Sequence, residues 1–325
     1  MAVHPTPNIP ASRLPLIIDC DPGIDDAIAL LWAMASDALD ILAITTVAGN
    51  VPQAITQANA RQVVAWGGKT HLKVYGGCPR PLLRPPVFAA HIHGDNGLGG
   101  LVLPPLQGSG ESRHGVQVLL DLLHRAPEPV TIATLGPLTN LAVALIQVPS
   151  LISQIREVVI MGGARGMGNI TPAAEFNFYG DPHAAQVVLS SGLPLTLIDL
   201  DLTHQVIATP ERLAKIRALG SPIALGIVQM LQGYELEGQQ RLGLSGPPIH
   251  DPCVIAYILH PELFTTGEGY AQVETQSPLT LGRSVVDFWG GEGSGGKVRV
   301  ALTVDAEGLF DRLVAAIASL GLSIG

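Results

Sequence analysis

Short apolar or β-branched runs alternate with segments of helical periodicity along most of the chain, and no other feature restricts the possible folds as strongly. The first unit has an apolar run at residues 16–19, helical spacing at 24–36 and a β-branched run at 41–47. The same order continues, with helices predicted at 55–66, 114–125, 138–146, 182–191 and 210–219 and strands at 73–75, 130–135, 157–161 and 195–199. Strands separated by helices require a mostly parallel sheet covered on both faces. The sequence therefore predicts an α/β fold with an open, mostly parallel, Rossmann-like sheet flanked by helices.

The pattern changes in the last third of the chain. Helices are predicted at 222–241 and 251–259, strands at 271–275, 284–288 and 298–304, and a closing helix at 308–320. The fold should thus carry additional C-terminal helices and strands. Because no internal repeat, low-complexity tract or linker divides the sequence, we expect a single domain at 14–325 behind a flexible, proline-rich N-terminal tail at 1–13.

Composition and charge exclude several classes of protein. With 325 residues, 47% of them apolar, the chain can bury a large core without disulfides. Its three cysteines, Cys20, Cys78 and Cys253, form no CxxC pair, which fits a reducing compartment and argues against a thiolate zinc site. A net charge of −9 with only 18 basic residues leaves little positive surface for polymeric nucleic acid. Since the sequence has neither a secretory signal nor an apolar run of about 20 residues, we expect a soluble cytoplasmic protein without a membrane partner.

Four carboxylates fall within eight residues where the first predicted strand gives way to a helix. The segment is Asp19-Cys20-Asp21-Pro22-Gly23-Ile24-Asp25-Asp26. Like charges this close repel and raise each other's pKa unless a cation or many hydrogen-bond donors lie among them. An oxygen-only set of ligands favours a hard cation, so calcium or magnesium is expected here rather than zinc.

A purely structural role for these acids is the alternative. Asp25 and Asp26 would then cap the helix, while Asp19 and Asp21 would accept hydrogen bonds from loop amides. Capping occupies one or two acids, however, and leaves the remaining carboxylates unexplained. The cluster therefore favours a metal site, and calcium tolerates the irregular coordination that it offers.

Polar residues also follow other predicted strands. In an open parallel sheet, ligands bind beyond the carboxyl ends of the strands. Asn50 follows the second strand, and a Gly-rich loop after the strand at 157–161 leads to Asn169, Glu175 and Asn177. An extended alternation would place Glu175 and Asn177 on one side of the chain and the neighbouring Phe rings on the other. Amide and carboxylate groups on a common face suit the hydroxyls of a sugar.

Two predicted helix starts carry polar side chains. Thr139 and Asn140 are predicted to be turn and cap residues. Asp251, in His250-Asp251-Pro252, fits an N-cap before a proline as well as it fits a metal ligand. His250 is a candidate general acid, because an exposed loop-to-helix junction would let it titrate and reach a cleft. A structural role is the alternative for this histidine.

Taken in order, five motifs resemble those of the nucleoside hydrolase family of the inosine-uridine preferring type. They are Asp19-Cys20-Asp21-Pro22-Gly23-Ile24-Asp25-Asp26, Gly136-Pro137-Leu138-Thr139-Asn140, Met161-Gly162-Gly163, Ala174-Glu175-Phe176-Asn177 and His250-Asp251-Pro252. The DxDPGxDD element is the most specific of the five. The resemblance implies a Ca²⁺-dependent hydrolase that uses water to cut the N-glycosidic bond of purine or pyrimidine ribonucleosides, and that serves nucleoside salvage.

The resemblance also implies roles for individual residues. Ca²⁺ would be held by the carboxylates of Asp21, Asp26 and Asp251 and the main-chain carbonyl of Leu135. The ribose would be bound by Asp25, Asn50 and Asn177 at its 2′- and 3′-hydroxyls, by Asn169 and Glu175 at its 5′-hydroxyl, and by Met161 beneath the ring. Asp21 would act as general base toward water, and His250 would protonate the departing base.

The base end of the site is less well defined. His93 resembles a loop histidine found near the base in many members of the family. His91 lies two residues away, and a plain surface loop without a role in binding is the alternative. Tyr234 is a candidate base contact. No motif decides between purine and pyrimidine. The family resemblance further implies a homodimer or homotetramer.

Two other functions compete with this one. A haloacid-dehalogenase-like phosphatase also begins with Asp-x-Asp after a strand and uses magnesium, but it expects Thr or Val where this chain has Gly23, and it has no role for Asp25 and Asp26. A non-catalytic nucleoside or ribose binder would keep the metal pocket without the chemistry. The presence of both Asp21 and His250 argues against such a binder.

Overall fold

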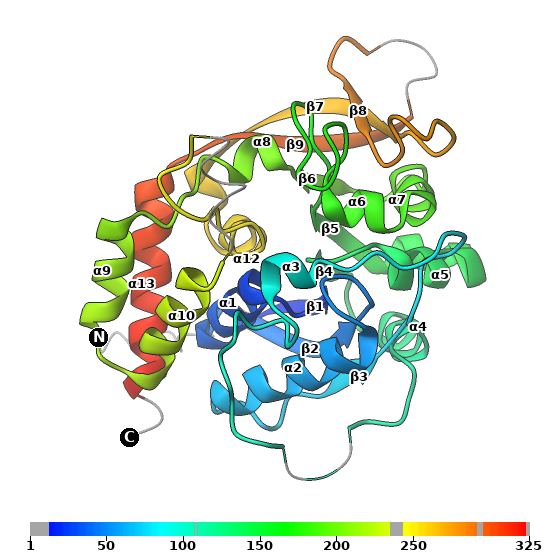
Figure 1. Ribbon diagram of the computed structural model, residues 1–325. Coiled ribbons are helices and arrows are strands. Elements are labelled where there is room, and N and C mark those ends of the chain that lie inside the picture. The colour runs from blue at the N-terminus through cyan, green and yellow to red at the C-terminus, as the bar shows by residue number, and fades with distance from the viewer. Residues whose placement is uncertain (1–12, 107, 109, 235–242, 291–294, 323–325) are drawn as a thin grey trace, which may run out of the picture.

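Figure 1 shows a computed structural model of the chain, which describes residues 13–106, 108, 110–234, 243–290 and 295–322. Within these residues a nine-stranded sheet has the order β3-β2-β1-β4-β5-β6-β9-β7-β8. Its strands are β1 (Leu14–Cys20), β2 (Leu39–Thr46), β3 (Val74–Gly76), β4 (Val130–Thr134), β5 (Ile155–Met161), β6 (Leu195–Ile198), β7 (Phe264–Val273), β8 (Ser284–Asp287) and β9 (Gly296–Val304).

The strands from β3 to β9 in this order pair in parallel, whereas β7 runs antiparallel to both β9 and β8. The order 3-2-1-4-5-6 is that of a doubly wound nucleotide-binding sheet. The predicted α/β class with added C-terminal strands is therefore confirmed.

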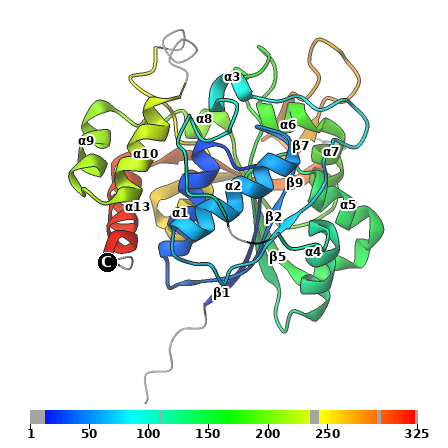
Figure 2. The ribbon, with the colours of Figure 1, turned by 60° about the horizontal axis from the view of Figure 1, so that its bottom comes forward.

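Helices cover both faces of the sheet, as Figures 1 and 2 show from two sides. Those on one face include α1 (Ile24–Ala35), α2 (Gln53–Trp66), α9 (Pro210–Ala218), α10 (Pro222–Gln232), α12 (Pro252–Leu259) and α13 (Ala306–Leu322). The other face carries α4 (Gly115–Arg125), α5 (Thr139–Gln147), α7 (Pro182–Leu189) and the 3-10 helix η1 (Pro149–Gln154). The short elements α3 (Ala90–His93), α6 (Phe176–Gly180), α8 (Leu200–Thr203) and η2 (Pro261–Leu263) lie in the connections.

The alternation of side chains along the central strands divides the core in two. Leu16 and Ile18 of β1 pack with the layer of α1, α10 and α12, while Ile17 packs with α4, α5 and α7. Burial on both sides explains why β1 is continuously apolar from Leu14 to Ile18. None of the described helices has the length and apolar content needed to cross a bilayer.

Several boundaries differ from those predicted. β7 begins at Phe264, earlier than the strand predicted at 271–275, because Gly267 and Gly269 suggest a loop in isolation but are held in the ladder by pairing with β9. The helix predicted at 222–241 ends at Gln232, and residues 235–242 lie outside the described residues. The tail predicted at 1–13 also lies outside them, apart from Arg13.

The sheet order locates a natural binding site. From β1 the chain continues to β2 and β3 on one side, whereas β4, β5 and β6 are added on the other. The connections that leave β1 and β4 therefore diverge and open a crevice beyond the carboxyl ends of these two strands. The aspartate-rich segment follows β1, and Leu135-Gly136 follows β4, so both lie at this crevice.

Candidate active site

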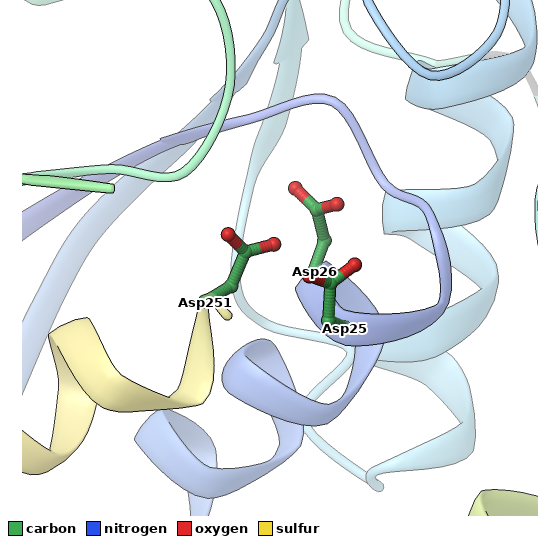
Figure 3. Close-up of side chains that lie close together, drawn as sticks. All are labelled: Asp25, Asp26 and Asp251. Carbon is green, nitrogen blue, oxygen red and sulfur yellow. The ribbon is translucent and has the colours of Figure 1, made fainter. Parts of the chain in front are cut away.

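Three aspartates meet where two helices begin. Asp25 and Asp26 lie in the first turn of α1, and Asp251 directly precedes Pro252, the first residue of α12. Figure 3 shows their carboxylates gathered above the N-terminal ends of these helices. One oxygen of each lies within 4.8 Å of the others, and all three residues are buried. Both helix dipoles favour negative charge at this point.

Asp21 lies fully buried between the loops that follow β2 and β4. Its Oδ2 accepts a hydrogen bond from the backbone N–H of Asn50 at 2.7 Å, while its buried Oδ1 has no hydrogen-bond partner among the described residues. Each of the two loops must have glycine next to the Asp21 carboxylate. A Cβ at Gly49 would lie 2.0 Å from Oδ2, and one at Gly136 would lie 2.3 Å from Oδ1. The two loops thus form a tight slot for this carboxylate.

Asp26 links Asp21 to the rest of the cluster. Its Oδ1 accepts from the N–H of Asp21 at 3.0 Å, and its Oδ2 accepts from the N–H of Gly23 at 2.9 Å and from the side-chain amide of Asn50 at 3.1 Å. Asp26 therefore does cap α1, as the structural alternative supposed. Asp251 does not fit that alternative, because its side chain makes no capping hydrogen bond to α12.

The electrostatics of the cluster call for a cation. Burial, and then repulsion from the neighbouring carboxylates, raises the pKa of Asp21 and Asp251 well above the ordinary value and that of Asp26 to about 7. None of the ion pairs seen in the described parts of the chain involves these residues. A divalent ion would supply the missing charge. The oxygens of Asp25, Asp26 and Asp251 lie close enough together to hold one, whereas the predicted ligand Asp21 is not part of this group, although its Oδ1 has no hydrogen-bond partner among the described residues.

Asn140 supports the cluster from below, and the prediction that it caps a helix is wrong. Its side-chain amide donates to Asp19 Oδ1 at 2.7 Å and to the carbonyl of Thr46 at 3.1 Å, and its oxygen accepts from the N–H of Cys78. Its fully buried side chain thus ties β1 and β2 to the loop after β3. Thr139 likewise makes no cap, since its hydroxyl donates to Asp181 at 2.7 Å.

Asn177 lies beside the carboxyl end of β4. Its side-chain amide donates to the carbonyl of Leu135 at 2.7 Å and to the carbonyl of Met161 at 3.2 Å. A carbonyl oxygen has two lone pairs, so the oxygen of Leu135 can accept this bond and still face the crevice. Leu135, Met161 and Asn177 therefore form one hydrogen-bonded wall.

Glu175 begins a helix, so the extended alternation predicted around it is wrong. Residues Phe176–Gly180 form α6, and the Glu175 carboxylate accepts from the backbone N–H groups of Asn177 at 2.7 Å, Gly163 at 2.9 Å and Phe178 at 3.1 Å. Local capping overrides the period-two pattern here. Despite three donors, burial raises the pKa of Glu175 to about 7.

His93 packs against the start of α1 with a defined ring orientation. Its Nδ1 accepts a hydrogen bond from the N–H of Ile24 at 3.2 Å, which leaves the ring proton on Nε2. Its ring meets that of Tyr234 edge to face at a centroid distance of 5.9 Å. Burial lowers the pKa of His93 to about 4, so His93 is a neutral donor at neutral pH. His91, by contrast, is exposed.

His250 is buried, with only 7% of its surface exposed, so the prediction of an exposed junction is wrong. Its Nδ1 lies 2.7 Å from the hydroxyl of Thr203, and its ring lies 5.9 Å from that of His204. Burial, and then His204, lowers the pKa of His250 to about 3. The imidazole is therefore neutral at neutral pH in the free protein.

These residues share one pocket of about 530 Å³. Every residue predicted for the site lines it except Asp21 and Asp26, which are fully buried beneath it. His204 and Phe176 also line the pocket and were missed. His204 follows β6 at the carboxyl edge of the sheet, so the strand-end rule that indicated Asn50 would also have found it.

A second hollow, of about 750 Å³, is lined by Gln186, Val285 and residues 272–277. It is open to solvent and contains one carboxylate, that of Glu274, and no histidine. The chemistry-bearing residues are therefore concentrated in the smaller pocket.

Comparison with known proteins identifies relatives in a single family. The family model of the inosine-uridine preferring nucleoside hydrolase matches residues 16–311. A pyrimidine-specific ribonucleoside hydrolase, RihA, from Escherichia coli is 42% identical over 301 residues, which cover 92% of this chain and 97% of RihA. An uncharacterized protein of Schizosaccharomyces pombe is 43% identical over 304 residues, with the same two coverages.

A solved structure has the same architecture. The purine-preferring ribonucleoside hydrolase from Gardnerella vaginalis matches with a TM-score of 0.87 and 30% identity, covering 94% of this chain and 98% of that one. These matches extend over nearly the whole chain, and the family model spans both the aspartate cluster and the segment around His250.

Proposed function

The chain belongs to the inosine-uridine preferring nucleoside hydrolase family and is an N-glycosyl hydrolase of ribonucleosides, and we propose that it acts with Ca²⁺ on pyrimidine ribonucleosides. The observation that carries the metal assignment is the set of buried carboxylates at the starts of α1 and α12, which offer oxygen ligands and form no ion pair with any described residue.

Four groups would hold the ion: the carboxylates of Asp21, Asp26 and Asp251 and the carbonyl of Leu135. Support for Asp21 comes from its buried, unpartnered Oδ1. Oxygen-only ligands and irregular spacing suit calcium better than zinc. When bound, a divalent ion supplies Lewis-acid chemistry and a fixed charge against which sugar hydroxyls and water are oriented.

The other residues of the site would contact either the sugar or the base. Asp25, Asn50 and Asn177 would bind the 2′- and 3′-hydroxyls, with Met161 beneath the ring. Asn169 and Glu175 would bind the 5′-hydroxyl. Asp21 would take a proton from water as the water oxygen attacks C1′ and the bond from C1′ to the base nitrogen breaks.

His250 would give a proton to the departing base. Because burial lowers the pKa of His250 to about 3, it meets the base as a neutral imidazole with an N–H to donate. Neutral imidazoles serve as hydrogen-bond donors to developing negative charge in other enzymes. His93 and Tyr234, whose rings are in contact, would also face the base.

The preference for pyrimidines is proposed from relatives of known substrate. RihA, at 42% identity, is named pyrimidine-specific, while the purine-preferring hydrolase from Gardnerella vaginalis is 30% identical. The greater identity to the pyrimidine enzyme favours uridine and cytidine over inosine. Release of base and reducing sugar from each of these nucleosides, with and without a calcium chelator, tests the proposal.

The same assay separates the alternatives. Chelation should abolish turnover, and added Ca²⁺ should restore it more fully than Mg²⁺. Binding of uridine without release of reducing sugar would indicate a nucleoside binder. Release of phosphate from a sugar phosphate would point to the phosphatase, which the family match does not favour.

His250→Ala tests the acid role. This variant should lose about 10² to 10⁴ in kcat on uridine, the usual contribution of a positioned proton donor, and little on p-nitrophenyl riboside, whose leaving group needs no proton. An equal loss on both substrates would contradict the role of His250.

Compartment, assembly and pathway are proposed on separate grounds. The described cysteines, Cys20, Cys78 and Cys253, are all free thiols, which supports a reducing cytoplasm. A homodimer or homotetramer that serves nucleoside salvage is proposed from the family resemblance alone. Light scattering coupled to gel filtration would determine the oligomeric state.

A further inference from the structure

Thr203, at the end of α8, is in direct contact with His250 but does not line the pocket. Its hydroxyl oxygen lies 2.7 Å from Nδ1 of His250, and both residues are buried. We infer that Thr203 is a positioning residue, whose hydroxyl fixes the orientation and the tautomer of His250 so that Nε2–H is presented to the nucleoside base. This inference rests on the proposed role of His250 as proton donor.

The hydroxyl proton of Thr203 has two possible acceptors. One is the carbonyl of Leu200 at 3.5 Å, and the other is Nδ1 of His250 at 2.7 Å. A separation of 3.5 Å is at the outer limit of a hydrogen bond, whereas 2.7 Å is ideal for a hydroxyl donor. The Thr203 hydroxyl therefore donates its hydrogen bond to His250, and Nδ1 is the acceptor.

An accepting Nδ1 determines what the other ring nitrogen does. A ring nitrogen that accepts a hydrogen bond carries no proton, so the proton of the imidazole resides on Nε2. Since Nδ1 is occupied by Thr203 and His250 lines the pocket, Nε2 is the nitrogen available to a molecule bound there. With the opposite tautomer, Nε2 would offer only a lone pair and could not give a proton to the base.

Thr203 is itself held in place, so its hydroxyl can fix the orientation of the His250 ring. Its N–H donates to the carbonyl of Asp199 at 3.0 Å, and the Asp199 carboxylate caps α8 by accepting from the N–H of Leu202 at 3.2 Å. Asp199 is in turn paired with Arg165 at 2.6 Å. The β-branched side chain of threonine also restricts χ1. The hydroxyl is thus fixed by the backbone that follows β6.

Three variants test the inference. Thr203→Val keeps the shape and removes the hydroxyl, Thr203→Ser keeps the hydroxyl, and Thr196→Val is a control. Thr196 is a buried threonine of β6 whose hydroxyl donates to Glu157 and which does not line the pocket. The kcat of each is measured on uridine and on p-nitrophenyl riboside, beside His250→Ala.

Thr203→Val should lower kcat on uridine about ten- to hundredfold, a part of the roughly 10² to 10⁴ expected of the donor itself, and change kcat on p-nitrophenyl riboside little. Thr203→Ser should restore turnover of uridine. In the His250→Ala background, Thr203→Val should add no further loss, because the two residues act as one unit.

The tautomer has a direct spectroscopic readout. In protein labelled with ¹⁵N-histidine, the signals absent from His250→Ala identify this ring, and their shifts should show a protonated Nε2 and an unprotonated Nδ1. Thr203→Val should convert the ring to a mixture of tautomers. Equal losses on both substrates in Thr203→Val, or a wild-type ring protonated on Nδ1, would overturn the inference. If His250→Ala lost as much kcat on p-nitrophenyl riboside as on uridine, the proposed acid role itself would be overturned, and the role of Thr203 with it.

Discussion

The carboxylate of Asp21 occupies a slot in which neither neighbouring loop leaves space for a different side chain. One oxygen accepts from the N–H of Asn50, and the other is buried without a partner in the described part of the chain. A group in this position can be replaced only by one of equal size. Asparagine has that size but neither the charge nor the basicity.

We therefore predict that Asp21→Asn lowers kcat on ribonucleosides by about 10² to 10⁴, the range for loss of a general base, and raises the Ca²⁺ concentration needed for half-maximal activity. Steady-state kinetics over a calcium titration measures both. Asp40→Asn, which removes a charge from the exposed part of β2, is the control. Unchanged calcium dependence in Asp21→Asn would exclude Asp21 as a ligand.

Glu175 lends itself to a prediction about stability rather than turnover. Both of its oxygens accept backbone N–H groups, so the amide nitrogen of a glutamine would oppose a donor. Glu175→Gln should lower the free energy of unfolding by about 1 to 3 kcal/mol, the cost of a buried unsatisfied group. Urea unfolding measures it. Glu274→Gln is the control, because the Glu274 carboxylate accepts two N–H groups at the surface, where water can replace it.

The stability deficit of Glu175→Gln, meaning its loss of unfolding free energy relative to the parent, should also change with pH in a defined direction. Because the pKa of Glu175 is raised to about 7 in the folded protein, its contribution to stability is present below the unfolded value and is lost as pH rises through 7. Glutamine does not titrate, so the deficit of Glu175→Gln should narrow between about pH 5 and pH 8. A deficit that widens over this range would contradict the raised pKa.

At the scale of elements, the loops after β2 and β4 do more than connect strands, because together they enclose Asp21. Gly49→Ala and Gly136→Ala would each place a methyl group within 2.0 to 2.3 Å of the carboxylate. Each should destabilise the fold by about 1 to 3 kcal/mol, as overpacking does, and lower kcat/KM about a hundredfold by displacing Asp21. Thermal unfolding and kinetics test this prediction.

Gly267→Ala is the matched control for these loops. Gly267 lies in β7, and the nearest atom to its added Cβ is a terminal methyl of Leu302 at 3.1 Å, which can move. This variant should remain active and about as stable as the parent, since alanine restricts the unfolded chain more than glycine does. If Gly49→Ala and Gly136→Ala behaved like it, the slot around Asp21 would not be as rigid as described.

Sequence patterns predicted those elements whose signal is local. The apolar run of β1 and the acids after it lie in one short segment, so the first βα unit and its aspartate cluster were found without knowledge of the rest. The strand alternation around Glu175 failed, because its carboxylate caps α6 from a position that an extended pattern also explains. Asn140 was misjudged because its partners, Asp19 and Cys78, are distant in the sequence.

At the scale of the whole molecule, the site exists because the doubly wound order brings together segments from both ends of the chain. Asp21 and Asp26 follow the first strand, whereas Asp251 arrives at the start of α12 near the other end. The fold thereby concentrates buried negative charge at one point. Without a metal, this repulsion lowers the free energy of unfolding. Metal binding and global stability should therefore be coupled.

The pH dependence of this coupling follows from the pKa shifts. Burial and mutual repulsion raise the folded-state pKa of Asp26 to about 7 and raise the pKa values of Asp21 and Asp251 well above the ordinary value. For a raised carboxyl pKa, stability is present below the unfolded value and is lost as pH rises through the folded value. The chelated protein should therefore become less stable between about pH 5 and pH 8 through these groups.

Bound Ca²⁺ should oppose this loss of stability at higher pH. The ion binds the ionised carboxylates and therefore competes with protons for them. The gain in unfolding free energy on adding Ca²⁺ should thus be small near pH 5 and grow toward pH 8, reaching about 2.7 kcal/mol at a hundredfold excess over Kd. Thermal unfolding with Ca²⁺ and with chelator, repeated across this range, measures the difference. Asp251→Asn should remove most of it, while Asp40→Asn should not. A calcium effect independent of pH would mean that the ion binds outside the buried aspartate cluster.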